Sequence, residues 1–265
     1  MKRLILALLA GSSLAAAEVQ AGAWTQDDGT GQAIVTLTYY RTETDYSADG
    51  VRTGDSTFGR FELSPLLEYG ATDSLTVGLQ PRYQWLRHEN ASGSDSTSHG
   101  LADIDFLARQ RLWRSDNSVL SFQGTVKLPG NGSDSRRPSI GSDQIDLEPR
   151  ILFGHGFQLG SWSGFINLEG AYRFRLQEPA DEIRFDATFG VRPVPDWLFL
   201  AQQLNTIGVR NEHGGGSDYD VYKTQLSVVY DVTPVLSLQL GGYVEVGNRN
   251  LDPGQAVFTA LWWKF

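Results

Sequence analysis

The stretch IRFDATFGVR (residues 183–192) alternates strictly between apolar and polar side chains. One set contains Ile183, Phe185, Ala187, Phe189 and Val191, and the other contains Arg184, Asp186, Thr188, Gly190 and Arg192. Successive side chains of a β-strand point to opposite faces, so this pattern predicts a strand with one apolar and one charged face.

The same alternation recurs along the chain, for example in INLEGAYRFR (166–175) and LSLQLGGYVEV (236–246), and helical periodicity is hard to find. We predict twelve strands, at 31–42, 57–70, 74–88, 101–114, 118–129, 143–156, 162–176, 181–193, 196–210, 218–231, 235–248 and 255–265.

The connections between these strands alternate in length. Tight turns such as GATDS (70–74) and PVPD (193–196) contrast with long polar connections, the three largest being 42–57, 89–100 and 129–142. Long loops on one side and short turns on the other are typical of outer-membrane barrels. The predicted fold is therefore all-β: a transmembrane, antiparallel, up-and-down β-barrel of about twelve strands.

A soluble β-sandwich is the alternative, since it also contains many alternating strands. The predicted strands are longer than the five or six residues usual in globular sheets. Aromatic residues also gather near the strand ends, as expected at two membrane interfaces. Those near the tight turns are Tyr69, Trp113, Trp162, Trp197, Tyr230, Trp263 and Phe265, and those near the long loops are Tyr39, Tyr83, Trp85, Tyr172, Phe174 and Tyr222.

The N-terminal stretch MKRLILALLAGSSLAAA (1–17) has two basic residues, a short apolar run and small residues. This order is typical of a secretory signal peptide, and the apolar run is too short for a spanning helix. Cleavage could follow Ala17 or Ala21; we favour Ala21, because GAWTQ then begins the mature protein. The domain assignment is a cleaved signal peptide at 1–21 and an outer-membrane barrel at 22–265, with a retained anchor as the alternative.

The composition narrows the function. The chain has no cysteine and a formal net charge of -9, so it cannot use disulfides, and its acidity argues against a nucleic-acid partner. No cofactor is expected, because no histidine pair has metal-ligand spacing. Ser98-His99 and Glu212-His213 are adjacent pairs in predicted loops, which is no evidence of a catalytic dyad, so we predict no enzyme.

The last strand, AVFTALWWKF (256–265), has an apolar face that extends to Phe265. We expect this face to meet outer-membrane lipid and the strand to pair with the first strand, which would leave no free edge. The strand resembles the terminal recognition signal of bacterial outer-membrane proteins, and this resemblance implies that the barrel-assembly machinery is a partner.

Charged residues occupy the other face of the strands. Turning a Lys or Arg toward mid-bilayer lipid costs roughly 2–4 kcal/mol, so we expect this face to line the interior. The candidate lumen-lining residues are Arg60, Glu62, Arg82, Asp103, Asp105, Arg109, Arg111, Lys127, Asp146, Glu148, Arg150, Glu169, Arg173, Arg184, Asp186, Lys223 and Glu245. Two interpretations stay open: the charges pair across strands in a narrow barrel, or some of them select a solute.

The stretch GLADIDFLARQRLWRSDNSVLSFQGTVKLPG (100–130) resembles the outer-membrane porin and transporter family labelled MetA-pathway phenol-degradation proteins. The matching residues are Gly100, Leu101, Asp103, Ile104, Arg111, Lys127, Leu128, Pro129 and Gly130, whereas Ala102 stands where the family usually has Gly. LEYGATDSLTVGL (67–79) is similar to a hairpin of the same family. The resemblance implies a barrel and solute passage, and no binding residue is transferred from it.

The predicted function is a passive channel or transporter for small organic solutes in the outer membrane of a Gram-negative cell. One alternative is a non-conducting surface barrel that acts with an exopolysaccharide or adhesion system through its outer loops. Another is a lipid-modifying enzyme. Eight-stranded barrels are filled by side chains and sixteen-stranded ones hold an open channel, so a narrow passage and a plugged interior both remain possible for twelve.

Overall fold

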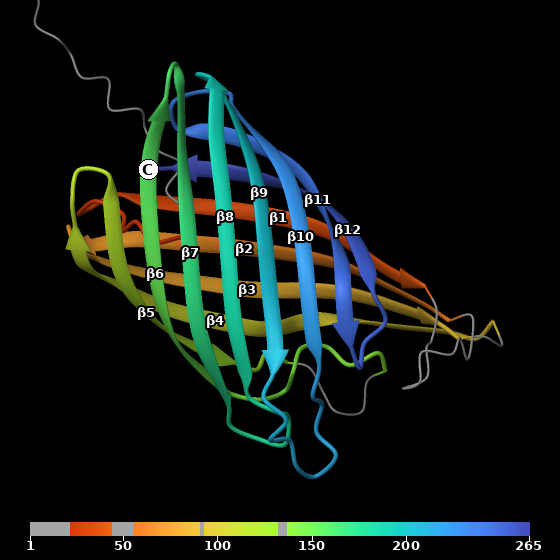
Figure 1. Cartoon of the computed structure of the whole chain (residues 1–265). Helices are drawn as coiled ribbons and strands as arrows, with labels where there is room; N and C mark the ends of the chain where they lie inside the picture. Colours follow the sequence, from red (N-terminus) through yellow and green to blue (C-terminus); the bar gives the residue numbers. More distant parts are fainter. Residues whose placement is uncertain (1–21, 44–55, 91–92, 132–136) are drawn as a thin grey trace, which may run out of the picture.

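The computed structural model describes residues 22–43, 56–90, 93–131 and 137–265, and within them the chain forms a closed antiparallel β-barrel (Figure 1). Each strand pairs with the next one in sequence, and the last pairs with the first. The strands are β1 (Gly31–Glu43), β2 (Thr57–Thr72), β3 (Leu75–Glu89), β4 (Asp95–Arg114), β5 (Ser118–Leu128), β6 (Asp146–Leu159), β7 (Trp162–Arg175), β8 (Glu182–Val194), β9 (Trp197–Gly208), β10 (Asp220–Asp231), β11 (Leu236–Arg249) and β12 (Gly254–Lys264). The predicted fold class is confirmed.

The seam between β1 and β12 closes the barrel over their full length, from Gln32 opposite Lys264 to Thr42 opposite Gly254. At its end, the amide of Gly31 donates to the carbonyl of Phe265 at 2.6 Å, and the amide of Phe265 donates to the carbonyl of Gly31 at 2.9 Å. Within the described residues, closure gives every strand a neighbour on both sides, which avoids the free sheet edge that a bilayer would not tolerate.

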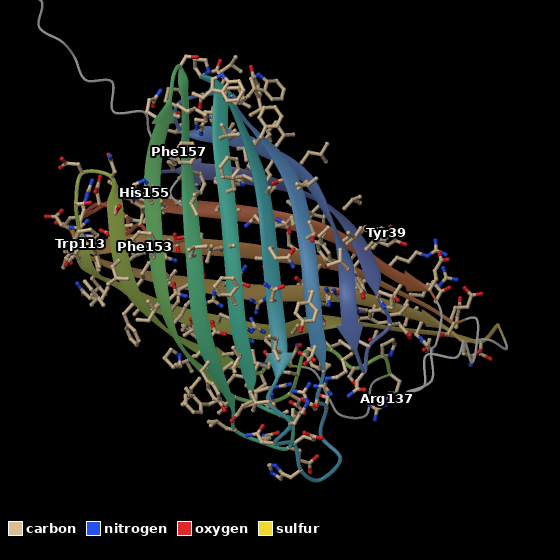
Figure 2. All side chains as sticks on the ribbon, viewed as in Figure 1. Tyr39, Trp113, Arg137, Phe153, His155 and Phe157 are labelled. Carbon is tan, nitrogen blue, oxygen red and sulfur yellow. The ribbon has the colours of Figure 1, made fainter. Side chains whose placement is uncertain are left out.

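The alternation in sequence becomes the inside and outside of the barrel. On β8, Phe185 and Phe189 are 51% and 44% exposed, while Gly190 on the other face is buried. Aromatic residues of the outer face lie toward both ends, with Trp113 near the tight turns and Tyr39 near the long loops (Figure 2). The apolar face of each strand is thus the membrane face.

The predicted start of the fourth strand was wrong. We expected 89–100 to be a loop, whereas β4 begins at Asp95 and pairs with the end of β3, from Asp95 opposite Glu89 to Leu101 opposite Tyr83. The Ser- and Thr-rich composition suggested a loop, but pairing with a neighbouring strand overrides that weak local preference.

A β-bulge then interrupts β4. Leu101 lies opposite Tyr83 and Ile104 opposite Pro81, so β4 has one more residue than β3 between these two pairs. The extra residue switches the face that points inward. Simple alternation across this point therefore fails, although it holds on either side of it.

Within the residues that the structure describes, no helix has the length and apolar content needed to cross a membrane. The predicted signal peptide, residues 1–21, lies outside the described part of the chain.

Candidate functional site in the barrel lumen

Residues 22–26, called here the lumenal segment, enter the barrel from the end that carries the tight turns. Ala23, Thr25 and Gln26 are 0%, 4% and 7% exposed. The amide of Ala23 donates to Oδ1 of Asn167 at 2.9 Å, and Oγ of Ser121 donates to the carbonyl of Ala23 at 2.6 Å. Backbone groups that have left the sheet are thus satisfied by inward side chains of the barrel wall.

Trp24 is the apolar anchor of the lumenal segment. Its ring meets that of Phe165 edge-to-face, with centroids 5.8 Å apart. It also packs against Val119 and Leu152. A side-chain carbon at Gly154 would lie 2.6 Å from the indole, so only glycine leaves room for it. The sequence did not reveal this segment, because a single Trp before the first strand carries no periodic signal.

Arg109 links the lumenal segment to the wall and is itself buried. Its guanidinium donates to Oε1 of Gln123 at 3.0 Å, to the carbonyl of Trp24 at 3.0 Å and to Oε1 of Glu68 at 2.8 Å. Arg111, further along the strand, donates to Oγ1 of Thr25 at 3.4 Å. Both were predicted to point inward, and both hold the lumenal segment in this structure.

A network of ion pairs covers the inner wall from β5 to β8. Its contacts are Lys127 with Asp146 at 2.5 Å, Arg173 with Glu148 at 2.7 Å, Arg150 with Glu148 and Asp186 at 2.8 Å each, Arg150 with Glu169, and Arg184 with Glu182 at 2.9 Å. Because this network is buried, removing a carboxylate would leave a cation unpaired, and a buried unpaired charge lowers the stability of the fold. In this wall the charges pair across neighbouring strands, which was the first of the two interpretations of the lumenal charges.

The remaining predicted residues also lie on inward strand faces. Their contacts are Arg82 with Asp105 at 2.7 Å, Asp103 with the amide of Ser142 at 3.1 Å, Arg60 with Glu62 at 3.7 Å, and Lys223 with Glu245 at 3.9 Å. The two last distances are beyond hydrogen-bond range. Lys223 and Arg60 are thus less completely neutralised than the cations of the β5–β8 wall.

The connection after β5, predicted as a long outer loop, folds back over the mouth of the barrel. Ile140 is 3% exposed and packs with Leu86 and Ala102. Gly141 has a φ of 65°, and a side-chain carbon there would lie 2.8 Å from Oδ1 of Asp103, so a larger residue would be strained. The described part of this loop therefore narrows the lumen from the side opposite the lumenal segment.

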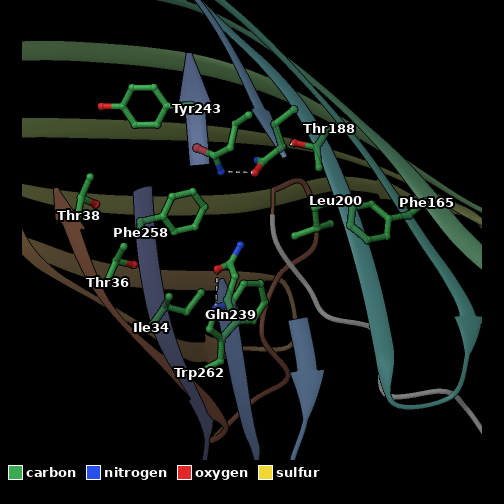
Figure 3. Close-up of a pocket in the computed structure, with 12 residues that line it drawn as sticks. Ile34, Thr36, Thr38, Phe165, Thr188, Leu200, Gln239, Tyr243, Phe258 and Trp262 are labelled. Carbon is green, nitrogen blue, oxygen red and sulfur yellow. Dashed lines mark hydrogen bonds between the residues drawn. The ribbon is translucent and has the colours of Figure 1, made fainter. Parts of the chain in front are cut away.

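A cavity of about 230 Å³ lies on the β7–β12 and β1 side of the lumen, and we call it the neutral chamber (Figure 3). It is lined by Ile34, Thr36, Thr38, Phe165, Thr188, Leu200, Gln202, Gln225, Gln239, Tyr243, Phe258 and Trp262. None of these side chains carries a charge at neutral pH, which is why a search for charged residues missed the chamber.

The polar groups of the chamber wall are held in place by one another. Nε2 of Gln225 donates to Oε1 of Gln202 at 2.7 Å, and Nε1 of Trp262 donates to Oε1 of Gln239 at 2.9 Å. Trp24 packs against the apolar cluster that contains Phe165 and Trp262, so the lumenal segment lies next to the chamber wall. The result is a preformed, amphipathic hollow of the kind that accepts small organic molecules.

Ser98 and His99, adjacent in sequence and considered as a catalytic pair, contact different partners. Oγ of Ser98 donates to the carbonyl of Pro138 at 2.6 Å, whereas Nδ1 of His99 lies 3.0 Å from the hydroxyl of Tyr83. Ser118 and His155 are directly paired across β5 and β6, with a 2.8 Å hydrogen bond that the sequence did not indicate. Among the described residues, no group of three or more His, Asp or Glu side chains is placed to hold a metal ion.

These features define a class: a twelve-stranded transmembrane β-barrel with its own N-terminal segment inside the lumen. The family described as "Putative MetA-pathway of phenol degradation" matches residues 16–265. The chain belongs to this family, as the resemblance of residues 100–130 suggested. A search of the curated proteins gave no significant match.

Solved structures show the same fold. An outer-membrane channel of Pseudomonas putida F1 aligns with a TM-score of 0.70 at 16% identity, over 94% of this chain and 100% of that one. The NanC porin aligns with a TM-score of 0.54 at 10% identity, over 88% and 100% of the two chains. The KdgM porin, in complex with disordered oligogalacturonate, aligns with a TM-score of 0.51 at 8% identity, over 88% and 99%.

Proposed function

We propose that this barrel is a passive channel or transporter for small organic solutes in the outer membrane, exported with a signal peptide that is removed after Ala21. The neutral chamber is the observation that carries the proposal. Its volume of about 230 Å³ suits a single-ring organic molecule, and its wall offers both aromatic faces and amide groups.

The lumen favours a narrow, selective path over a wide pore. The lumenal segment packs against the chamber wall through Trp24, and the loop around Ile140 packs against inward residues of β3 and β4. A solute must therefore displace or pass these segments. A small chamber with two segments inserted into the lumen beside it fits slow, selective passage better than bulk diffusion.

Liposome swelling tests the proposal. Proteoliposomes with folded barrel should admit single-ring solutes such as benzyl alcohol and benzoate faster than empty liposomes do, and faster than a disaccharide of greater size. If folded barrel gives neither solute flux nor stepwise conductance, the channel proposal is wrong and the non-conducting surface barrel gains support.

A pair of neighbouring residues on β8 offers a matched control. Thr188 lines the chamber, whereas Ala187 lies on the outer face of the same strand. Thr188→Phe should fill the chamber and reduce flux several-fold, while Ala187→Phe should leave flux unchanged. Equal flux through both variants would show that the solute does not use the chamber.

A further inference from the structure

Above the neutral chamber, on the side away from Trp262, the strands that line it carry cations. Inward residues two apart on a strand are separated by about 6.6 Å. On β10, the next inward residue beyond Gln225 of the chamber is Lys223. On β1, the next inward residue beyond Thr38 of the chamber is Tyr40, whose ring contacts Arg60. Tyr243 lies at this end of the chamber (Figure 3).

Two stacked tyrosines hold these cations in place. The rings of Tyr40 and Tyr243 are 6.3 Å apart. The guanidinium of Arg60 lies 5.1 Å from the centre of the Tyr40 ring, and the ammonium of Lys223 lies 5.2 Å from that of Tyr243. Cation–π contact fixes the two side chains without neutralising them.

The carboxylates that face this pair are engaged elsewhere. Oε2 of Glu245 accepts hydrogen bonds from Tyr40 at 3.3 Å, Asn248 at 2.9 Å and the amide of Gly254 at 2.9 Å. Its other oxygen remains 3.9 Å from the ammonium of Lys223.

Glu62, in turn, accepts from Gln84 at 2.7 Å and lies 3.7 Å from Nε of Arg60. That Nε is buried and has no hydrogen-bond partner within the described residues. The side chains of Arg60 and Lys223 as a whole are 28% and 33% exposed, so a ligand in the lumen can reach them.

Arg184, which belongs to the β5–β8 wall, is paired with Glu182 at 2.9 Å. In the β5–β8 wall each cation meets a carboxylate directly, so the unsatisfied positive charge is concentrated at Arg60 and Lys223, next to the mouth of the chamber.

We infer that Arg60 and Lys223 form a carboxylate-binding subsite, and that the neutral chamber below them takes the uncharged part of the same molecule. The preferred ligand is thus a small amphipathic monocarboxylate with an apolar or aromatic body, of which benzoate is the simplest probe. Arg60 donates from its guanidinium, and Lys223 donates from its ammonium to the second carboxylate oxygen. This inference rests on the proposed function only for transport, because the binding itself can be measured separately.

The test is calorimetric titration of the folded, detergent-solubilised barrel with benzoate, benzyl alcohol and benzylamine. Benzoate should bind roughly tenfold tighter than benzyl alcohol, as expected for one charge-assisted hydrogen bond, and benzylamine should bind more weakly than either. Arg60→Gln and Lys223→Gln should each remove this preference, and Arg60→Lys should restore part of it.

Arg87→Gln is the control, because Arg87 lies on the outer face of β3, is 63% exposed and pairs with Asp95. It should leave the preference unchanged. Heat-modifiable gel mobility confirms that each variant is folded before it is titrated.

Equal affinity for benzoate and benzyl alcohol in the folded wild type overturns the subsite. A benzoate preference that survives in both Arg60→Gln and Lys223→Gln also overturns it. If benzoate binds as expected but does not cross the membrane in proteoliposomes, the subsite stands and the channel proposal fails.

Discussion

Replacing Trp24 by alanine should loosen the lumenal segment from the barrel. Removing a well-packed Trp costs about 3–5 kcal/mol, and because Trp24 is only partly buried we expect the lower value. The carbonyl of residue 24 still accepts from Arg109, so the loss is confined to the indole and its contacts with Phe165, Val119 and Leu152. About 3 kcal/mol corresponds to a rise of roughly 10²-fold in the fraction of molecules whose segment has left the lumen.

The chain has no cysteine, which makes this fraction measurable without background labelling. Thr25→Cys places a thiol at a position that is 4% exposed while the segment is docked. In the Trp24→Ala background, the rate of labelling by a membrane-impermeant maleimide should rise by about the same factor, roughly 10². Larger conductance steps should appear in planar bilayers as the segment leaves.

Trp113→Ala is the matched control, because Trp113 is 51% exposed on the outer face near the same end of the barrel. It should change neither labelling nor conductance. If Trp24→Ala raises the labelling rate by less than about threefold, the indole does not hold the segment, and the assignment of Trp24 as its apolar anchor is wrong.

Four further predictions follow from separate contacts. Gly154→Val should push the indole of Trp24 out of its place and raise labelling of Thr25→Cys, whereas Gly170→Val, whose position has open space around it, should not. Lys127→Met leaves the carboxylate of Asp146, which is 1% exposed, with a hydrogen bond from Gln144 at 2.9 Å and with Arg173 at 3.8 Å as its nearest cation. This change should lower the free energy of unfolding by about 3 kcal/mol in urea titrations, and adding Asp146→Leu should recover much of that loss. The hydrogen bond from Arg249, at 2.6 Å, holds the pKa of Asp218 below its ordinary value. The resulting stabilisation of the outer loop is therefore present above about pH 4 and is lost as the pH falls through the lowered pKa. Carboxyl ¹³C NMR should show that Arg249→Gln moves the titration midpoint of Asp218 upward. Phe265→Ala should slow assembly in cells several-fold, measured by heat-modifiable mobility, while Trp162→Ala should not; equal rates would argue against recognition of the terminal strand by the assembly machinery.

The sequence alone determined the strands, their number and the face that each turns to the membrane. Alternation with period two is a local property, and a bilayer penalises any charged residue on the wrong face, so patterns such as IRFDATFGVR (183–192) predict both the strand and its orientation. The start of β4 was misjudged because a polar strand at the rim lacks that alternation. The candidate lumen-lining charges were chosen for the same reason, since a charged residue is costly on the membrane face.

Only the tertiary structure decided what fills the barrel and which charges are satisfied. Trp24 and Ile140 reach the lumen through contacts with residues more than thirty positions away, and no local pattern encodes such contacts. Likewise, Arg150 and Arg60 both lie on inward strand faces, but Arg150 forms ion pairs with three carboxylates. Nε of Arg60 lies 3.7 Å from Glu62 and has no hydrogen-bond partner among the described residues. The difference arises from strand register around a closed ring, which places each side chain opposite partners that come from other strands.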